Sequence, residues 1–462
     1  MERARSSRQY VSKAALVLCA LVAGLVLPSA AHARLVFPAP QPLSPVGEGA
    51  SDPAVAVDPQ DRATVAWLRF GGGQLRIESA RVGADGVPGE VNTLLSVAQD
   101  RLFGPQVALG PDGGATVVWE RDTEIFKKSD CSAGAFSTCV QAVRIDPGGA
   151  PGPVMTLARF DTPERDPDIV GATKGPQVAV DSQGRATVAW ASTDYEAGTL
   201  GVIQSVRLEA DGSPEPVQTL SVDPAANPSL AIDPEDRVTV VWDRARRIEA
   251  VRLGADGTPG TVQTLFKRGA NADPQVAVDR RGRATVVWAE DQKPRRIRSV
   301  RLGADGDPGA VRTMARGSRS PKLDLDPRGR ATVVWQRTTP TKRVLKFRVQ
   351  SARLGTNGRP GAVKTLSKSR GSLPEVAVDG RGRATVVWHR LRLKDKRDIE
   401  RIEARRLRPR GGMERVQTLA KKEGVGFPRV AVDSAGRPTV AWAVSALGVG
   451  GLIEATRGRE RG

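Results

Sequence analysis

The fold is most clearly indicated by residues 274–314, PQVAVDRRGRATVVWAEDQKPRRIRSVRLGADGDPGAVRTM. Four runs rich in β-branched and small apolar residues alternate in this stretch with segments rich in Asp, Gly and Pro. The runs lie at residues 274–278, 284–288, 297–302 and 310–314. Such runs are typical of strands, and such segments are typical of tight turns. The stretch therefore predicts four short antiparallel strands joined in sequence order.

The same pattern recurs eight times, as P-x-V-A-V-D-x-x-G-R-A-T-V-V-W, a variable connection, I-x-A-V-R-L, G-A-D-G-x-P-G and x-V-Q-T-L. The repeats lie near residues 53–94, 105–157, 176–220, 228–265, 274–314, 321–366, 374–419 and 428–457. Each repeat contains one of the eight tryptophans, Trp67, Trp119, Trp190, Trp242, Trp288, Trp335, Trp388 and Trp442. Repeated four-stranded units of this length predict a β-propeller, because each sheet must bury its faces against its neighbours.

The ends of the chain indicate how the ring closes. The eighth repeat stops after its third strand and lacks a V-Q-T-L segment. Residues 39–46, PAPQPLSP, precede the first repeat and supply a surplus strand. We therefore expect an all-β propeller of eight four-stranded blades, closed by the N-terminal strand completing the last blade. A linear or two-domain stack of repeats is the alternative.

The first 33 residues have the composition of a targeting segment. They contain Arg3, Arg5, Arg8 and Lys13, then the apolar run 14–27, and end on Ala31-His32-Ala33. A basic region, an apolar region of this length and an A-x-A site predict a secretory signal peptide cleaved before Arg34. We expect a secreted protein whose propeller domain is residues 34–462, because no later segment is apolar enough to span a bilayer.

Residues suited to catalysis or metal binding are few after residue 33. His389 and Tyr195 are the only histidine and tyrosine there, and no G-x-S-x-G motif occurs. Cys131 and Cys139 are the only cysteines after residue 33, and an oxidising compartment favours a disulfide between them, with two free thiols as the alternative. We therefore expect no cofactor and no metal, and the sequence shows no catalytic constellation.

Most recurrent residues have a structural interpretation. Seven repeats begin their first turn with Asp and place Arg four residues later, where the two side chains can pair. A second arginine closes the third strand of every repeat, at Arg81, Arg144, Arg207, Arg252, Arg301, Arg353, Arg406 and Arg457. We expect these guanidinium groups to bind carbonyl or carboxylate oxygens between blades. The alternatives are that they bind anions and that the tryptophans stack on sugars.

The pattern resembles the repeats of uncharacterised exported bacterial β-propeller proteins, over nearly all of the chain after residue 33. It is also distantly similar to the Asp-box of sialidase-like propellers, S-x-D-x-G-x-T-W. The run Asp279-Arg280-Arg281-Gly282 has one residue more between Asp and Gly. Sialidases also need a tyrosine nucleophile, which Tyr195, expected in a loop, does not supply. The resemblance therefore implies an exported propeller and not a sialidase.

The two faces of the expected ring differ in sequence. Successive strands run up and down, so the D-x-x-G-R and G-A-D-G-x-P-G turns lie on one face. The connections after each Trp and after each V-Q-T-L lie on the other face, and they vary in length and composition. Variable loops on a rigid scaffold are where binding sites usually occur. We call this second face the variable face.

Charge is unevenly distributed along the chain. Residues 34–240 hold 16 Lys and Arg and 28 Asp and Glu, a net charge of −12, whereas residues 241–462 hold 50 and 22, a net charge of +28. The basic excess concentrates in connections after Trp, at residues 243–247, 292–296, 341–348 and 389–397, and the acidic connections are 120–124 and 160–168. A basic arc predicts an anionic partner. A solvated surface set by biased composition is the alternative.

We therefore expect a secreted, non-enzymatic binding scaffold that engages an anionic cell-surface polymer or a protein through the variable face. The candidate ligand-binding residues are Arg244, Arg246, Arg247, Lys293, Arg295, Arg296, Lys342, Arg343, Lys346, Arg390, Arg392, Lys394, Lys396 and Arg397. Nucleic acid is disfavoured, because these loops lack aromatic side chains on which bases could stack. The alternatives are a glycan-active hydrolase or lyase with carboxylates in the channel, and a surface protein whose rings self-associate.

Overall fold

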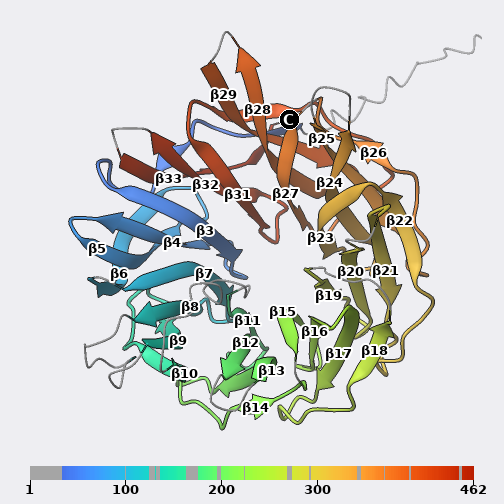
Figure 1. The fold of residues 1–462 in the computed structure, drawn as a ribbon. Coiled ribbons are helices and arrows are strands. Elements are labelled where there is room, and N and C mark those ends of the chain that lie inside the picture. Colours follow the sequence, from blue (N-terminus) through green and yellow to red (C-terminus); the bar gives the residue numbers. More distant parts are fainter. Residues whose placement is uncertain are drawn as a thin grey trace, which may run out of the picture.

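The computed structural model describes residues 34–98, 100–123, 131, 136–162, 175–194, 199–222, 224–267, 273–290, 293–340, 345–368, 370–394, 397–446 and 450–461. These ranges contain 34 β-strands and no helix. Eight four-stranded sheets follow one another around a ring, as the colours of Figure 1 show. The predicted eight-bladed β-propeller is therefore confirmed. The signal peptide expected at residues 1–33 lies outside the described residues.

Each blade is an antiparallel meander whose first strand lies nearest the ring centre (Figure 1). Blade 1 comprises β3 (Gly49–Val57), β4 (Ala63–Gly71), β5 (Gln74–Val82) and β6 (Pro88–Val97). Blade 2 comprises β7 (Arg101–Leu109), β8 (Ala115–Thr123), β9 (Phe136–Ile145) and β10 (Met155–Thr162). Blade 3 comprises β11 (Gln177–Val180), β12 (Ala186–Asp194), β13 (Thr199–Leu208) and β14 (Gln218–Thr219). Blade 4 comprises β15 (Ala225–Ile232), β16 (Val238–Arg244), β17 (Arg247–Leu253) and β18 (Gln263–Phe266).

The second half of the ring repeats this plan. Blade 5 comprises β19 (Gln275–Val278), β20 (Ala284–Glu290), β21 (Arg296–Arg301) and β22 (Arg312–Arg316). Blade 6 comprises β23 (Ser318–Leu325), β24 (Ala331–Pro340), β25 (Leu345–Leu354) and β26 (Lys364–Thr365). Blade 7 comprises β27 (Gly371–Val378), β28 (Ala384–Lys394), β29 (Arg397–Leu407) and β30 (Gln417–Lys421). Blade 8 comprises β31 (Val425–Val432), β32 (Pro438–Ala446), β33 (Gly450–Arg457) and, from the other end of the chain, β2 (Gln41–Pro42).

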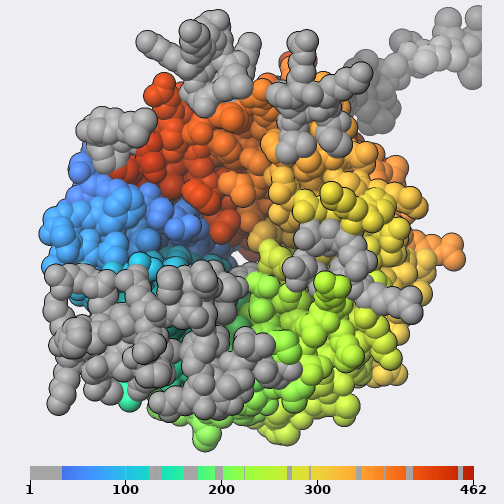
Figure 2. All heavy atoms as spheres, in the orientation of Figure 1, coloured from blue at the N-terminus to red at the C-terminus, as the bar shows by residue number. Residues whose placement is uncertain are grey.

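The strand β2 closes the ring as the sequence predicts, although it is shorter than the segment 39–46. Gln41 pairs with Ala455, and the N–H of Leu43 donates to the carbonyl of Ile453 at 2.7 Å. A second closure was not predicted: β1 (Arg34–Val36) pairs antiparallel with β34 (Arg459–Arg461). The blue and red sectors consequently meet in both views of the ring (Figures 1 and 2).

The hydrophobic core is divided into eight clusters, one between each pair of neighbouring blades. In one cluster Val241 and Ile248 of blade 4 pack against Val286 and Trp288 of blade 5. Another cluster joins blade 8 to blade 1, so the ring has no open interface. Every tryptophan is at most 1% exposed. The tryptophans are therefore core residues, as predicted, and they offer no platform for sugars.

In seven blades the indole N–H group of the tryptophan donates to the residue directly opposite on the third strand. Trp67 and Trp388, for example, donate to Glu78 at 3.1 Å and to Glu403 at 3.0 Å. Gln or Glu accepts this bond in seven blades. In blade 5 Arg298 stands opposite Trp288, whose buried Nε1 has no hydrogen-bond partner. A buried polar partner for Trp is therefore a repeat feature that the consensus pattern had concealed.

Candidate functional site

The turns opposite the variable face are built by the Asp and Arg series. The Asp58 carboxylate accepts the backbone N–H of Arg62 at 2.7 Å and the side-chain Nε–H of Arg62 at 2.8 Å. The equivalent pair occurs in all seven repeats that contain both residues. The predicted Asp–Arg pairing is confirmed, and these residues hold turns rather than a ligand.

The second arginine series clasps each blade to the next. Arg81 of blade 1 donates to the carbonyls of Gly113 at 2.6 Å and Asp146 at 2.8 Å in blade 2. Arg457 of blade 8 closes the cycle by binding the carbonyls of Gly83, at 3.2 Å, and Asp61 in blade 1. The corresponding contacts are Arg144 to Ala210, Arg207 to Ala255, Arg252 to Gly282, Arg301 to Gly329, Arg353 to Gly382 and Arg406 to Gly436. The predicted interblade role is confirmed for all eight.

A recess of about 60 Å³ between blades 5 and 6 belongs to the same face. Its wall includes Thr285, Arg301, Arg312 and Gly358. The guanidinium group of Arg301 already has protein partners, because it donates to the Gly329 carbonyl at 2.8 Å and to the Asp279 carboxylate at 2.5 Å. The recess is therefore a gap beside the clasp, with its principal cation neutralised.

On the variable face the structure separates the candidate cations into three groups. Lys342, Arg343 and Lys396 lie outside the described residues. Arg392, Lys394 and Arg397 are described for their backbone alone, in β28 and β29. The remaining eight are Arg244, Arg246, Arg247, Lys293, Arg295, Arg296, Lys346 and Arg390.

Two of these eight residues are half-buried and pair with a buried glutamate of their own blade. Arg244 Nη1 lies 3.3 Å from Glu249, and Arg390 Nη1 lies 2.6 Å from Glu403. Each of these glutamates also accepts the indole N–H of its blade's tryptophan. Arg244 and Arg390 therefore neutralise the buried acceptor of Trp. The sequence signal for this role was an arginine two residues after Trp in a blade with Glu opposite.

The other six candidates differ in exposure. Arg295 and Arg296 are half-buried, and Arg296 lies 3.5 Å from Glu290. Four residues are exposed: Arg246, Arg247, Lys293 and Lys346. No carboxylate of a described residue lies within 4.0 Å of their charged groups. We call these four residues the exposed basic set. Arg246 and Lys293 lie on the connections between the second and third strands of blades 4 and 5, and Arg247 and Lys346 lie at the start of the third strands of blades 4 and 6.

The hairpin that carries Arg246 is strained. Ala245 and Arg246 both have positive φ, 43° and 68°, in the two-residue turn between β16 and β17. Blade 1 makes the same turn with Gly72 and Gly73, at φ 59° and 73°. Turns of this kind favour glycine, because a Cβ is disfavoured at positive φ. Blade 4 therefore presents an arginine at a tip that the fold alone would give to glycine.

The innermost strands depart from the repeat in blades 6 to 8. The residue after the strand's proline is Lys322, Glu375 and Arg429 in these blades, whereas it is Ala, Gln or Ser in the other five. Glu375 lies 3.5 Å from Lys322 and 2.9 Å from Arg429, so it bridges three adjacent blades. Glu375 therefore serves as an ion-pair contact among these blades.

Asp324 is the second carboxylate of this region, at a position that is Ala in the other seven blades. Its side chain accepts the backbone N–H groups of Leu325 and Val378, each at 2.7 Å. Burial nevertheless raises the pKa of the Asp324 carboxyl to about 6. Asp324 and Glu375 are the non-repeating carboxylates that the glycosidase alternative requires, but both already serve as contacts between blades.

The upper rim of the innermost strands is formed by the residue before each strand's proline. A bulge interrupts strand pairing at this point in six blades. Leu373 and Phe427 occupy the position in blades 7 and 8, at φ 49° and 51°, and are 43% and 47% exposed. Bulky residues at positive φ are rare outliers. This rim, unlike the basic loops, could not be read from the repeat pattern.

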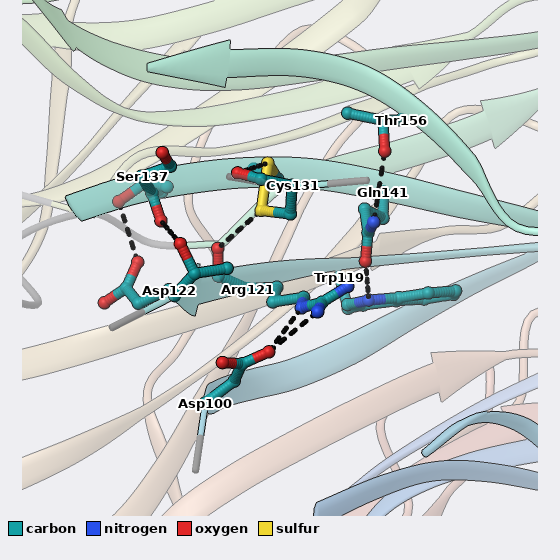
Figure 3. The surroundings of a disulfide bond; sticks show 11 residues. Asp100, Trp119, Arg121, Asp122, Cys131, Ser137, Gln141 and Thr156 are labelled. Atoms are coloured by element: carbon teal, nitrogen blue, oxygen red, sulfur yellow. Dashed lines mark hydrogen bonds and ion pairs between the residues drawn. A yellow bond between two sulfur atoms is a disulfide. The ribbon is translucent and has the colours of Figure 1, made fainter. Parts of the chain in front are cut away.

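Cys131 and Cys139 form a disulfide on the variable side of blade 2 (Figure 3). Beneath it Arg121 Nε donates to Asp100 at 2.8 Å, and Trp119 donates to Gln141 at 3.2 Å. The disulfide therefore ties the connection after Trp119 to β9 (Figure 3). It sits on the acidic side of the ring, away from the exposed basic set.

The described residues contain neither a membrane-spanning helix nor a cluster of metal-binding side chains. No helix there is long and apolar enough to cross a membrane. No group of three or more His, Cys, Asp and Glu residues within the described ranges could hold a metal ion.

No protein-family pattern matches the chain, and no curated protein matches it. Among solved structures, it is similar to a protein of unknown function from Dyadobacter fermentans, with 14% identity, a TM-score of 0.42 and coverage of 79% of this chain and 96% of that one. It is also similar to a puromycin hydrolase, with 17% identity, a TM-score of 0.45 and coverage of 85% and 58%. For the NanB sialidase from Streptococcus pneumoniae the values are 9%, 0.41, and 75% and 67%. The chain spans less than two thirds of the puromycin hydrolase, and at such low similarity no activity transfers.

Proposed function

We propose that this protein is an exported binding scaffold whose variable face engages an anionic polymer or an acidic protein surface. The observation that carries the proposal is the exposed basic set, Arg246, Arg247, Lys293 and Lys346. Cations without a nearby carboxylate attract polyanions, release their counterions on binding and so bind more weakly as salt rises. The strained turn at Ala245 and Arg246 supports a functional reason for placing a cation there.

Export supports the choice of a cell-surface polymer. The segment 1–33 has the features of a signal peptide, with an A-x-A site before Arg34. The face opposite the variable face is occupied by the Asp–Arg turns and the interblade arginine contacts. The variable face therefore remains for a partner. The proposal therefore assigns folding to one face of the ring and recognition to the other.

The test is binding of residues 34–462 to fluorescent heparin and to poly(glycerol phosphate) over a salt series. We expect affinity to fall steeply with salt, and replacement of all four exposed basic residues by Gln to reduce the salt slope by about 3. The matched control replaces four exposed arginines of the opposite face, Arg280, Arg281, Arg328 and Arg359, by Gln. Equal loss of binding in both variants would show that net charge alone is responsible and would overturn the proposal.

A further inference from the structure

Blade 7 brings together a serine, a histidine and a glutamate on three adjacent strands. Ser372 lies on β27, His389 on β28 and Glu400 on β29. Ser372 and His389 are direct cross-strand partners, and Ser372 Oγ lies 3.3 Å from His389 Nδ1. On the other side of the imidazole ring, His389 Nε2 lies 3.6 Å from Glu400 Oε1. A hydroxyl, an imidazole and a carboxylate in this order are the parts of an acyl-transfer triad.

The three side chains are placed by the alternation of residues along the strands. His389 follows Val387 by two positions and pairs with Ile402, which itself follows Glu400 by two. Val387 and Ile402 pack in the core cluster shared with blade 8. Because residues two apart share a sheet face, His389 and Glu400 lie at the end of this same interface. Their side chains are 14% and 24% exposed, so the group is sheltered yet reachable from solvent.

The electrostatics suit a general base. Burial lowers the pKa of His389, and the nearby Glu400 carboxylate opposes that shift only in part. The imidazole is therefore neutral at pH 7. His389 Nε2 is buried without a hydrogen-bond partner among the described residues, and it faces Glu400. With the proton on Nε2, the Nδ1 lone pair faces the hydroxyl of Ser372, and the longer contacts can tighten when a substrate excludes water.

The repeat does not impose this group. Five other blades pair residues at the same position, and these pairs are Ser51 with Leu68, Phe103 with Glu120, Ala226 with Asp243, Arg319 with Gln336 and Gly426 with Ala443. None of these pairs joins a hydroxyl to an imidazole. The chain after residue 33 thus uses its one histidine beside a serine.

One backbone position near Ser372 is also unusual. Arg370 and Leu373 flank the serine at φ 45° and 49°. Blades 6 and 8 place Gly317 and Gly424 where blade 7 has Arg370, and in all three this residue's carbonyl accepts the same second-strand N–H. The left-handed φ at Leu373 recurs at the residue before the proline in four other blades, so blade 7 departs from its neighbours at Arg370, which carries a side chain where they have glycine. Strain of this kind collects at functional sites.

We propose that Ser372, His389 and Glu400 form a nucleophilic centre that hydrolyses carboxylic esters. Ser372 Oγ attacks the ester carbonyl carbon as its proton moves to His389 Nδ1. The tetrahedral intermediate collapses, the carbon–oxygen bond to the alcohol breaks, and the alcohol leaves with that proton. Water then attacks the acyl-serine, again giving a proton to His389, and the carboxylic acid leaves as Oγ regains a proton. Glu400 is a positioning residue that holds the imidazole. This activity goes beyond the proposed polymer binding and does not depend on it.

The test treats residues 34–462 with a fluorophosphonate probe, which transfers its phosphonyl group to an activated serine and releases fluoride. We expect one label per chain, mapped by peptide mass spectrometry to the peptide containing Ser372, together with turnover of p-nitrophenyl acetate. Mapping on the unaltered protein needs no variant to fold. An absence of labelling at excess probe, or labelling confined to another residue, overturns the proposal.

Variants then assign the roles of the three residues. Ser372→Ala should abolish labelling, whereas Ser51→Ala, the same position in blade 1 without a histidine, should leave it unchanged. His389→Gln should slow labelling by about 10²–10⁴-fold. Glu400→Gln should slow it less, and Glu400→Asp should restore most of the rate, which a purely structural role would not predict. Heparin binding by the same variants should be unchanged, so failure of either proposal is distinguishable from failure of the other.

Discussion

At the scale of single residues, the protein separates positions that repeat from positions that depart from the repeat. The eight clasp arginines and the seven Asp–Arg turns make the same contacts around the ring. Departures include Lys322 and Asp324 in blade 6, and Glu375 and the Ser372–His389 pair in blade 7. A residue that breaks a repeat without serving the fold is a candidate for function.

Asp324 gives a prediction at this scale. Its folded pKa, about 6, lies above the ordinary value of 3.8, so the folded chain binds this proton more tightly than the unfolded chain. Stability from this group is therefore highest at low pH and falls by about 3 kcal/mol as pH rises from about 4 to 7. Asp324→Asn keeps a hydrogen-bond acceptor and removes the titration. Urea unfolding across this pH range should lose that slope in the variant, and an unchanged slope would show that other groups cause it.

At the scale of elements, each blade is a meander whose faces are completed by its neighbours. Trp288 packs against blade 4, and Phe266 of that blade lies 5.4 Å from it between ring centroids. The two-residue hairpins of blades 1 and 4 differ in sequence but not in conformation. Gly72-Gly73 and Ala245-Arg246 adopt the same left-handed turn. The scaffold tolerates this strain because the paired strands on both sides fix the turn.

The hairpin of blade 4 gives a matched pair of variants. Replacing Ala245 and Arg246 by Gly should stabilise the protein by about 1–2 kcal/mol, since the steric cost of a Cβ at positive φ is removed. Replacing Gly72 and Gly73 by Ala should destabilise it by a similar amount. Both are measured as the free energy of unfolding in urea. A loss of stability in the blade 4 variant would mean that the side chains contribute contacts that outweigh the strain.

At the scale of the whole molecule, the ring is closed by three independent contacts. The strand β2 completes blade 8, β1 pairs with β34, and Arg457 clasps blade 1. Glu460 of β34 also lies 3.0 Å from Arg406 of blade 7, so the C-terminal strand is tied to the body of the ring. Closure buries the interface between blades 8 and 1, which an open stack would expose.

Removal of residues 34–46 tests closure directly. The deletion removes β1, β2, the buried Leu43 and the hydroxyl of Ser44 that accepts the Ile453 N–H at 2.9 Å. We expect a lower midpoint and a broader transition on heating, and a larger hydrodynamic radius, because blades 8 and 1 can separate. The control deletes residues 34–37 alone, which spares β2 and should cost much less. An equally sharp transition in both deletions would assign closure to the clasp and the interblade core.

The sequence by itself determined the architecture of this protein. The period of the repeat, the single tryptophan in each unit and the surplus segment at 39–46 were enough to predict eight blades and their closure, because each element is specified locally and repeated. The sequence also predicted the pairing of Asp58 with Arg62 and the role of Arg81 between blades, since the same residues recur at fixed spacing. Contacts that repeat at a fixed spacing can therefore be predicted from the sequence.

Tertiary structure alone decided which side chains are available for chemistry. Arg244 and Arg390 share the composition of the exposed basic set, yet each neutralises a buried glutamate, because residues two apart on a strand share a sheet face. Ser372, His389 and Glu400 lie on three strands and acquire meaning only when hydrogen bonding between strands sets their register. Sequence spacing does not encode that register for an irregular hairpin, so the site could be recognised only in the folded ring.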